Sequence, residues 1–191
     1  IVSRDWSSDV CSSDLAQALR LKQANPDFVF GCLYEAETVV LLREMKKLGV
    51  NAPVMGTGGT DLENTYKRAG DFDTVKNYFV VHAYADSVDG PRLKKYVDII
   101  KKYYPNETIT GFSVNSIGSA VMVAEVLKKI GPNLSRERFM EEMEKVKDFD
   151  SGVFAGRFTY GPNDHDGIVE SAVAGWVGNK ATVLKAWNQP Y

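Results

Sequence analysis

The sequence offers few side chains with the spacing that catalysis or metal binding requires. Its two histidines, His82 and His165, share no H-x-x-x-H spacing, and its two cysteines, Cys11 and Cys32, form no C-x-x-C pair. No serine or cysteine stands in a G-x-S-x-G context. These patterns predict no catalytic residue, no metal site and no cofactor.

The individual reactive groups have simple structural interpretations. His82 lies in an apolar run and is expected to be an ordinary strand histidine, whereas His165 lies in a turn that we expect it to organise. Cys32 is expected to be a small apolar residue of a buried strand. Asp164 and Asp166 are expected to be solvated turn carboxylates rather than an acid/base pair.

Two segments have the position and polarity of a ligand site. Tyr34 follows the apolar run 28–32, and the turn Gly56-Thr57-Gly58-Gly59-Thr60-Asp61 follows the apolar run 53–55. Ligands of open α/β sheets bind outside the carboxyl ends of the strands, and backbone N–H groups near a helix N-terminus can face a polar ligand group. The alternatives are a capping tyrosine and an ordinary strand-to-helix turn, with Asp61 as a helix N-cap.

Alternating elements must position these two segments. Hydrophobic periodicity predicts helices over 16–24, 35–48 and 62–68 and buried strands over 28–32, 53–55 and 77–85. Gly49 stands where the glycine after a helix C-terminus belongs. Helix and strand alternating at this spacing predict βαβ units and a parallel sheet.

The second half of the chain begins with three predicted helices. The first opens at Pro91, and the second, over 113–130, has an uncharged stretch from 113 to 124 that predicts burial on nearly every side. The third starts after the N-cap Ser135. Its inward-facing residues are expected to be Phe139, Met140, Met143 and Val146. A strand over 156–160, a turn over 161–167 and a hairpin of 172–177 with 181–187 then follow.

Composition excludes several classes of partner. The 191 residues are 44% hydrophobic and 25% charged, which is typical of a globular protein with one sizeable or two small domains. A formal net charge of −2 with interspersed signs provides no footprint for nucleic acid or an anionic membrane. No apolar run approaches the roughly 20 residues needed to span a bilayer, and no export signal opens the chain.

The composition of the first residues differs abruptly from that of the sequence that follows. The stretch Asp5 to Leu15 resembles, codon by codon, the conceptual translation of a common sequencing-adapter oligonucleotide. A Ser/Asp-rich linker is the alternative. We therefore expect residues 1–15 to be adapter-derived, and the natural protein to be truncated here with its N-terminal half, including any signal peptide, absent.

From residue 16 to 187 the order of elements and several strings resemble one family, the branched-chain amino-acid binding proteins of ABC importers. The strings are Asn25 to Phe30 leading to Tyr34, Leu42 to Val50, Pro53 to Gly56, Gly152 to Phe158 and Tyr160 to Gly167. The resemblance implies an α/β, Rossmann-like, parallel-sheet fold of type I periplasmic-binding proteins, truncated at the N-terminus, in which two lobes joined by three crossovers close on a ligand.

The resemblance also implies a division of the chain and a set of site residues. Residues 16–84 belong to the second lobe, 85–150 return to the first lobe as helices, and 151–191 cross back with a hairpin. The implied ligand-binding residues are Tyr34, Glu35, Gly56, Thr57, Gly58 and Phe112. Tyr34 and Phe112 are the aromatic walls, although Phe112 has core packing as its alternative. Amino-acid binders carry a carboxylate for the ligand ammonium where this chain has Gly58, so an α-amino acid is not assured.

The function implied is that of an extracytoplasmic solute-binding protein without catalysis. It is expected to be periplasmic and monomeric, to bind a branched-chain amino acid, an amide or a small carboxylate, and to deliver it to the permease of an ABC importer. A ligand-sensing domain of the same fold is the alternative, and an α/β enzyme would need a base and a nucleophile from the absent half. Expressed alone, residues 16–191 are expected to expose a large apolar patch and to bind ligand poorly.

Overall fold

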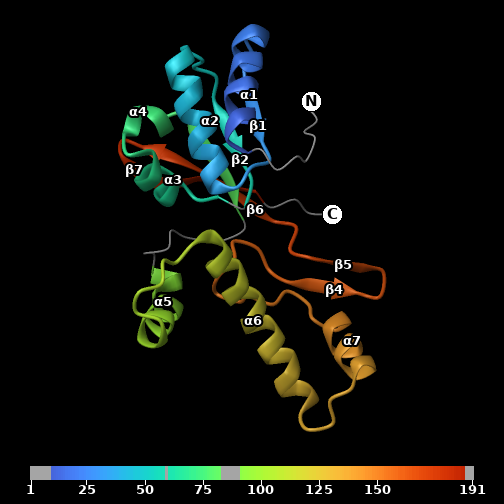
Figure 1. The fold of residues 1–191 in the computed structure, drawn as a ribbon. Coiled ribbons are helices and arrows are strands. Elements are labelled where there is room, and N and C mark those ends of the chain that lie inside the picture. The colour runs from blue at the N-terminus through green and yellow to red at the C-terminus, as the bar shows by residue number, and fades with distance from the viewer. Residues whose placement is uncertain (1–9, 59, 83–90, 188–191) are drawn as a thin grey trace. The chain divides into compact units, whose positions relative to one another are not determined.

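The computed structural model describes residues 10–58, 60–82 and 91–187 (Figure 1). The chain divides into two units, one of residues 1–80 with 175–180 and one of residues 81–174 with 181–191. The predicted segments 16–84, 85–150 and 151–191 have different boundaries, and their assignment to lobes stays a prediction.

The first unit alternates helix and strand as predicted. Its elements are α1 (Val10–Ala24), β1 (Val29–Gly31), α2 (Glu35–Leu48), β2 (Val54–Gly56), α3 (Leu62–Ala69), α4 (Phe72–Val75) and β3 (Tyr78–His82). The strands β1, β2 and β3 are parallel neighbours. The sheet has the order β1-β2-β3-β6-β7, where β6 is Ser171–Val177 and β7 is Lys180–Trp187. The parallel α/β fold class is confirmed.

Local signals set the ends of these elements. Gly49 ends α2 in the left-handed region at φ 71°, and its backbone N–H donates to the carbonyls of Lys46 and Met45. The α1 helix starts at Val10, six residues before the predicted start. The short α4 helix was not predicted; Asp71 caps it by accepting from the backbone N–H of Thr74.

The two faces of the sheet differ in burial. The connection from β1 to β2 and the connection from β2 to β3 cross the sheet in the same direction. Because such connections between parallel strands are right-handed, α2 and α3 lie on the same face of the sheet, where they contact each other. On the other face Phe30, Met55 and Phe79 lie in direct register across the three strands. Phe30 is 62% exposed.

The prediction of a buried strand over 28–32 is therefore wrong in part. Only Val29 is buried, whereas Phe28 is half exposed and Cys32 lies beyond the end of β1 and is exposed. The physical reason is that β1 pairs on one side only among the described strands and is covered on one face. His82 ends β3, but its side chain and residues 83–85 of the predicted strand lie outside the described part of the chain.

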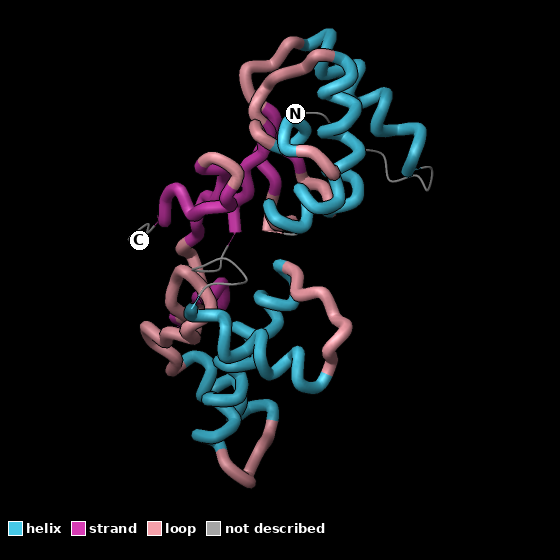
Figure 2. Tube along the Cα trace, turned by 90° about the vertical axis from the view of Figure 1, so that its left-hand side faces the viewer, coloured by secondary structure: helices cyan, strands magenta, loops and turns pink. Residues whose placement is uncertain are grey.

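Among its described residues the second unit has three helices followed by a short hairpin (Figure 2). Its helices are α5 (Pro91–Tyr103), α6 (Gly111–Ile130) and α7 (Arg136–Glu144), and its hairpin pairs β4 (Thr159–Gly161) with β5 (Asp164–Gly167) in antiparallel register. The predicted turn over 161–167 is thus a turn followed by a strand. His165 lies in that strand and contacts Glu144 of α7 at 3.3 Å instead of organising a turn. Asp164 and Asp166 are exposed, as predicted.

The predicted burial of α6 on nearly every side is wrong. Gly118, Met122 and Val126 lie on its buried face, whereas Ser116 and Ala120 are exposed. The buried face packs against Phe154, Phe158 and Val146 of the unit's larger apolar cluster. An uncharged sequence permits burial of a helix face, but a covering element has to be present to bury it.

The third helix follows its predicted cap. The Ser135 hydroxyl oxygen accepts a hydrogen bond from the backbone N–H of Arg138 at 3.2 Å. Phe139, Met143 and Val146 pack into the same apolar cluster. Met140, predicted to face inward, is 40% exposed.

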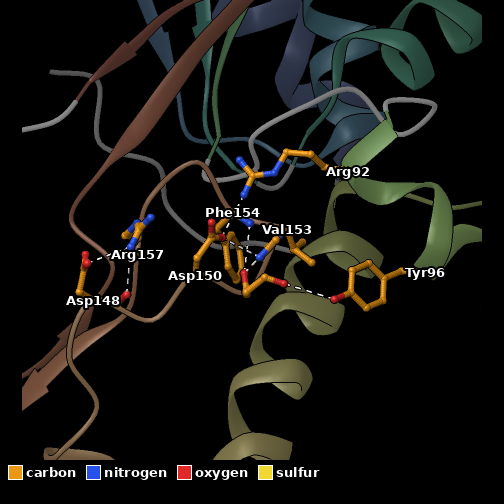
Figure 3. Close-up of polar contacts among 9 residues, drawn as sticks. Arg92, Tyr96, Asp148, Asp150, Val153, Phe154 and Arg157 are labelled. Atoms are coloured by element: carbon orange, nitrogen blue, oxygen red, sulfur yellow. Dashed lines mark hydrogen bonds and ion pairs between the residues drawn. The ribbon is translucent and has the colours of Figure 1, made fainter.

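The segment between α7 and β4 is tied to α5 by polar contacts (Figure 3). Arg92 pairs with Asp150 at 2.9 Å, and the Tyr96 hydroxyl donates to the Ser151 carbonyl at 3.3 Å. The Ser151 hydroxyl oxygen accepts from the backbone N–H of Val153 at 3.2 Å, which folds the segment back on itself. These contacts fix the connection that carries Phe154 to α6.

The chain closes its sheet with a tight hairpin. β6 and β7 are neighbours in the sheet and are joined through Gly178, which has φ 58°. A left-handed residue at this place is typical of a two-residue hairpin turn. The predicted hairpin of 172–177 with 181–187 is confirmed to within one residue at each strand start.

Candidate ligand-binding site

Strand register brings the two predicted ligand segments to one edge of the sheet. Gly31 of β1 is paired with Gly56 of β2, and each is the last residue of its strand. Tyr34 follows Gly31 by three residues and Thr57 follows Gly56 directly. Because the strands are parallel, Tyr34 and the β2 turn, residues 56–58 with 60 and 61, both leave the sheet at its carboxyl edge.

Tyr34 is presented at this edge by the start of α2. It is the N-cap residue of the helix and is 60% exposed. Its backbone N–H donates to the Glu37 carboxylate at 3.1 Å, and its carbonyl accepts from the Thr38 N–H at 2.9 Å. The backbone of Tyr34 is therefore held while its ring faces solvent, which suits an aromatic wall for a small solute.

The side chain of Glu35 is paired with another residue of the first unit. Its side chain is 17% exposed and forms an ion pair with Arg68. Burial raises the pKa of the Glu35 carboxyl and nearby Asp61 raises it further, while Arg68 opposes both. The structure places this predicted site residue beside Tyr34 in sequence, but with its carboxylate engaged by Arg68.

The first residue of the β2 turn is a glycine because a side chain at this position would clash with its neighbours. Gly56 is buried, and a Cβ at this position would lie 2.0 Å from the Tyr78 hydroxyl oxygen. The Thr57 carbonyl accepts from both the backbone N–H of Thr60 at 3.1 Å and the Thr60 hydroxyl at 3.0 Å. Thr57 and Gly58 are partly exposed at the edge. Two hydrogen bonds between Thr60 and Thr57 thus close the turn.

Asp61 acts as the N-cap of α3, as its position predicts. One carboxylate oxygen accepts from the Asn64 backbone N–H at 2.7 Å, and the other accepts from the Asn64 side-chain amide at 2.8 Å. Asp61 is 8% exposed. Both carboxylate oxygens thus accept hydrogen bonds from Asn64, and these bonds stabilise the start of the helix that follows the β2 turn.

A buried polar cluster under the β2 turn was not predicted. Tyr78 of β3 is fully buried and its hydroxyl lies 2.6 Å from the Thr60 hydroxyl. Thr38 of α2 is 3% exposed and, like Thr60, lowers the pKa of Tyr78. Burial, with smaller contributions from Asp61 and Glu35, raises the pKa of Tyr78 to about 12 against the effect of these two threonines. Tyr78 and Thr60 meet here only through strand register, so no spacing in the sequence signals the cluster.

Phe112, the remaining predicted site residue, belongs to the second unit. It is the second residue of α6 and is 51% exposed. The helix start is held by a reciprocal pair, in which the Thr110 N–H donates to the Ser113 hydroxyl at 3.2 Å and the Ser113 N–H donates to the Thr110 hydroxyl at 3.4 Å. The alternative of plain core packing for Phe112 is wrong within this unit.

Within the described part of the chain no group of three or more histidine, cysteine, aspartate or glutamate side chains is arranged to hold a metal ion. No helix among the described residues combines the length and apolar character that crossing a membrane requires. The carboxyl edge of the first unit presents the Tyr34 ring, the Thr57 hydroxyl and backbone groups, which are groups that can contact a small molecule.

Comparison with known proteins decides the family. Residues 10–181 match a family model described as periplasmic binding protein. The chain belongs to the periplasmic binding protein family. This confirms the resemblance and the type I fold class inferred from the sequence. A comparison with curated proteins found no match.

Solved periplasmic binding proteins share the fold of this chain at low sequence identity. A branched-chain amino acid ABC transporter protein from Thermus thermophilus with bound valine has a TM-score of 0.81 and 15% identity, over 98% of this chain and 52% of its own. A fatty acid ABC transporter substrate-binding protein from Thermomonospora curvata has a TM-score of 0.79 and 19% identity, over 95% of this chain and 48% of its own. A leucine binding protein from Thermotoga maritima has a TM-score of 0.69 and 20% identity, over 98% of this chain and 51% of its own. The chain thus spans about half the length of these neighbours.

Proposed function

We propose that this chain is part of an extracytoplasmic solute-binding protein that captures a small solute and delivers it, chemically unchanged, to the permease of an ABC importer. The observation that carries the proposal is the shared sheet edge. In a periplasmic binding protein fold, Tyr34 and the β2 turn leave adjacent parallel strands at the edge where α/β proteins bind ligands.

The chemistry of this edge supports a solute with both apolar and polar parts. The exposed Tyr34 ring can cover an apolar group, and Thr57 with Gly58 offers a hydroxyl and backbone groups to a polar one. The fold neighbours have bound valine, or are named for leucine or fatty acid. An amino acid, an amide or a carboxylic acid with an aliphatic part is therefore the class of ligand that we propose.

The ligand-binding set that we propose is the one inferred from the sequence: Tyr34, Glu35, Gly56, Thr57, Gly58 and Phe112. Glu35 enters it with its carboxylate already paired to Arg68, so its contribution is to hold the start of α2 beside Tyr34. Phe112 would meet the ligand from the opposite lobe, and its exposed ring is consistent with that role. We further propose that residues 16–84 and 151–191 form the second lobe and that 85–150 belong to the first.

Ligand-observed saturation-transfer NMR on the 191-residue chain tests the proposal, because it detects weak complexes. The probes are L-valine, L-leucine, L-leucinamide and octanoate. We expect weak binding of at least one probe, since half of a two-lobed site leaves much of a ligand in water. Tyr34→Ala should weaken that binding by about tenfold, the typical loss when a central aromatic contact is truncated.

Tyr104→Ala is the matched control, because Tyr104 is 64% exposed and lies in the second unit. It should leave binding unchanged. A chain that takes up none of the four probes, or that loses binding equally in both variants, would count against the proposal.

A further inference from the structure

We propose that Tyr78 is a positioning residue for the ligand edge: its buried hydroxyl anchors the β2 turn to β3, and so fixes the Thr57 backbone that faces the solute. The inference rests on the proposed function for its purpose. The anchoring itself is a property of the chain that can be measured without a ligand.

The direction of the hydrogen bonds follows from counting hydroxyl protons. The Thr60 hydroxyl donates its only proton to the Thr57 carbonyl at 3.0 Å. The Tyr78 hydroxyl, 2.6 Å from the Thr60 oxygen, must then donate to it. The result is one directed chain from the Tyr78 hydroxyl through the Thr60 hydroxyl to the Thr57 carbonyl.

This chain of hydrogen bonds joins β3 to the β2 turn at the edge. Tyr78 lies on β3 and is paired with Val54 of β2. Thr60 and Tyr78 are 1% and 0% exposed, so water does not compete for their hydroxyls. A hydrogen-bonded chain in such surroundings gives its members one preferred orientation. Displacing the Tyr78 hydroxyl would release the Thr60 end of the β2 turn.

The sequence makes room for this anchor at one position. Any side chain on residue 56 would place a Cβ 2.0 Å from the Tyr78 hydroxyl oxygen and 2.9 Å from the Thr60 hydroxyl oxygen. Glycine at 56 is therefore what lets a ring from β3 reach under the end of β2. The high pKa of Tyr78, about 12 because of burial, keeps the phenol protonated and able to donate across the physiological range.

Amide hydrogen exchange of Thr60, measured by NMR on the 191-residue chain, tests the anchor, because the Thr60 N–H closes the β2 turn by donating to the Thr57 carbonyl. In Tyr78→Phe we expect Thr60 exchange to rise by about fivefold to tenfold, as the loss of one net hydrogen bond predicts. Tyr160→Phe is the matched control: its hydroxyl also lies against a glycine, Gly167, but in the second unit. It should leave Thr60 exchange unchanged.

Substitutions at Thr60 provide an independent check if Tyr78→Phe unfolds. Thr60→Ser retains the hydroxyl and should keep wild-type exchange of the turn amide, whereas Thr60→Val removes both hydrogen bonds of the hydroxyl and should raise exchange at least as much as Tyr78→Phe. Equal exchange in the serine and valine variants, or an equal rise in Tyr78→Phe and Tyr160→Phe, would overturn the anchor. Octanoate and L-valine binding is a separate readout: if Thr60 responds as expected but the wild-type chain binds no probe, the proposed function fails and the anchor stands.

Discussion

The paired glycines Gly31 and Gly56 provide a sharp test of the packing at the ligand edge. They are direct partners in adjacent parallel strands and each ends its strand, so an alanine at either position meets the same backbone setting. Their surroundings differ. A Cβ on Gly31 would meet its nearest atom, the Met55 carbonyl oxygen, at 3.8 Å, whereas a Cβ on Gly56 would meet the Tyr78 hydroxyl oxygen at 2.0 Å.

The cost of Gly56→Ala follows from what has to move. Tyr78 is fully buried in a strand, and its Cζ would lie 2.8 Å from the new methyl group, so the whole ring must shift. Forcing a methyl group into such a place costs about 1–3 kcal/mol. Pulling the Tyr78 hydroxyl off Thr60 leaves buried polar groups unpaired and adds about 1–3 kcal/mol. We therefore expect Gly56→Ala to lower the free energy of unfolding by about 2–6 kcal/mol.

Urea unfolding of the two variants gives the answer. Gly31→Ala should be neutral or stabilise by up to about 1 kcal/mol, because alanine restricts the unfolded chain more than glycine does. Tyr78→Phe in the Gly56→Ala background removes the oxygen that clashes, so the two changes should be coupled by at least about 1 kcal/mol. Equal stability of the two alanine variants, or additivity in the double variant, would show that the Tyr78 hydroxyl does not exclude a side chain at position 56.

Three further predictions concern other parts of the chain. Gly118→Ala would place a Cβ 2.2 Å from the buried Phe154 ring and should lower the free energy of urea unfolding by about 1–3 kcal/mol. Ser135→Ala removes the N-cap of α7 and should cost about 1 kcal/mol in the same assay. Lys46 is the largest cause that lowers the pKa of Asp71 from 3.8 to about 2. Asp71 therefore contributes stability above pH 3.8 that is lost as pH falls toward 2, and the difference in Tm between wild type and Asp71→Asn should shrink over that range.

Each of these has a result that would contradict it. Gly131→Ala, where a Cβ meets open space, probes only the cost of a positive φ, so a loss in Gly118→Ala no larger than in Gly131→Ala speaks against the Phe154 contact. Ser135→Asn should retain the cap, and a variant as unstable as Ser135→Ala argues against capping. A Tm difference for Asp71→Asn that grows on acidification reverses the expected sign.

The sequence predicted several element ends that one residue determines locally. Gly49 after α2, Asp61 before α3 and Ser135 before α7 are each where short-range capping chemistry requires them. The order of these elements along the chain was sufficient to indicate a parallel α/β fold. The edge that carries Tyr34 and the β2 turn follows from that order, because parallel strands end on one side.

Burial and long-range contacts were predicted less well, for a physical reason. An apolar residue such as Phe30 or Met140 can be buried, but burial also depends on a covering element that its own sequence does not specify. The anchor through Thr60 and Tyr78 depends on which residues of β3 and the β2 turn meet. A change of one residue in strand register would separate them, and a single sequence does not encode that register visibly.

A map of backbone amide shifts, recorded as L-valine and octanoate are titrated into the chain, tests most directly whether the solute binds at the carboxyl edge of the sheet. The shifts should concentrate at Tyr34, Thr57 and Gly58, on the carboxyl edge of β1 and β2. Asn51 and Asn77, which precede β2 and β3 at the opposite edge, should not move. Shifts centred on Asn51 and Asn77, with Tyr34 and Thr57 unchanged, would contradict binding at the carboxyl edge.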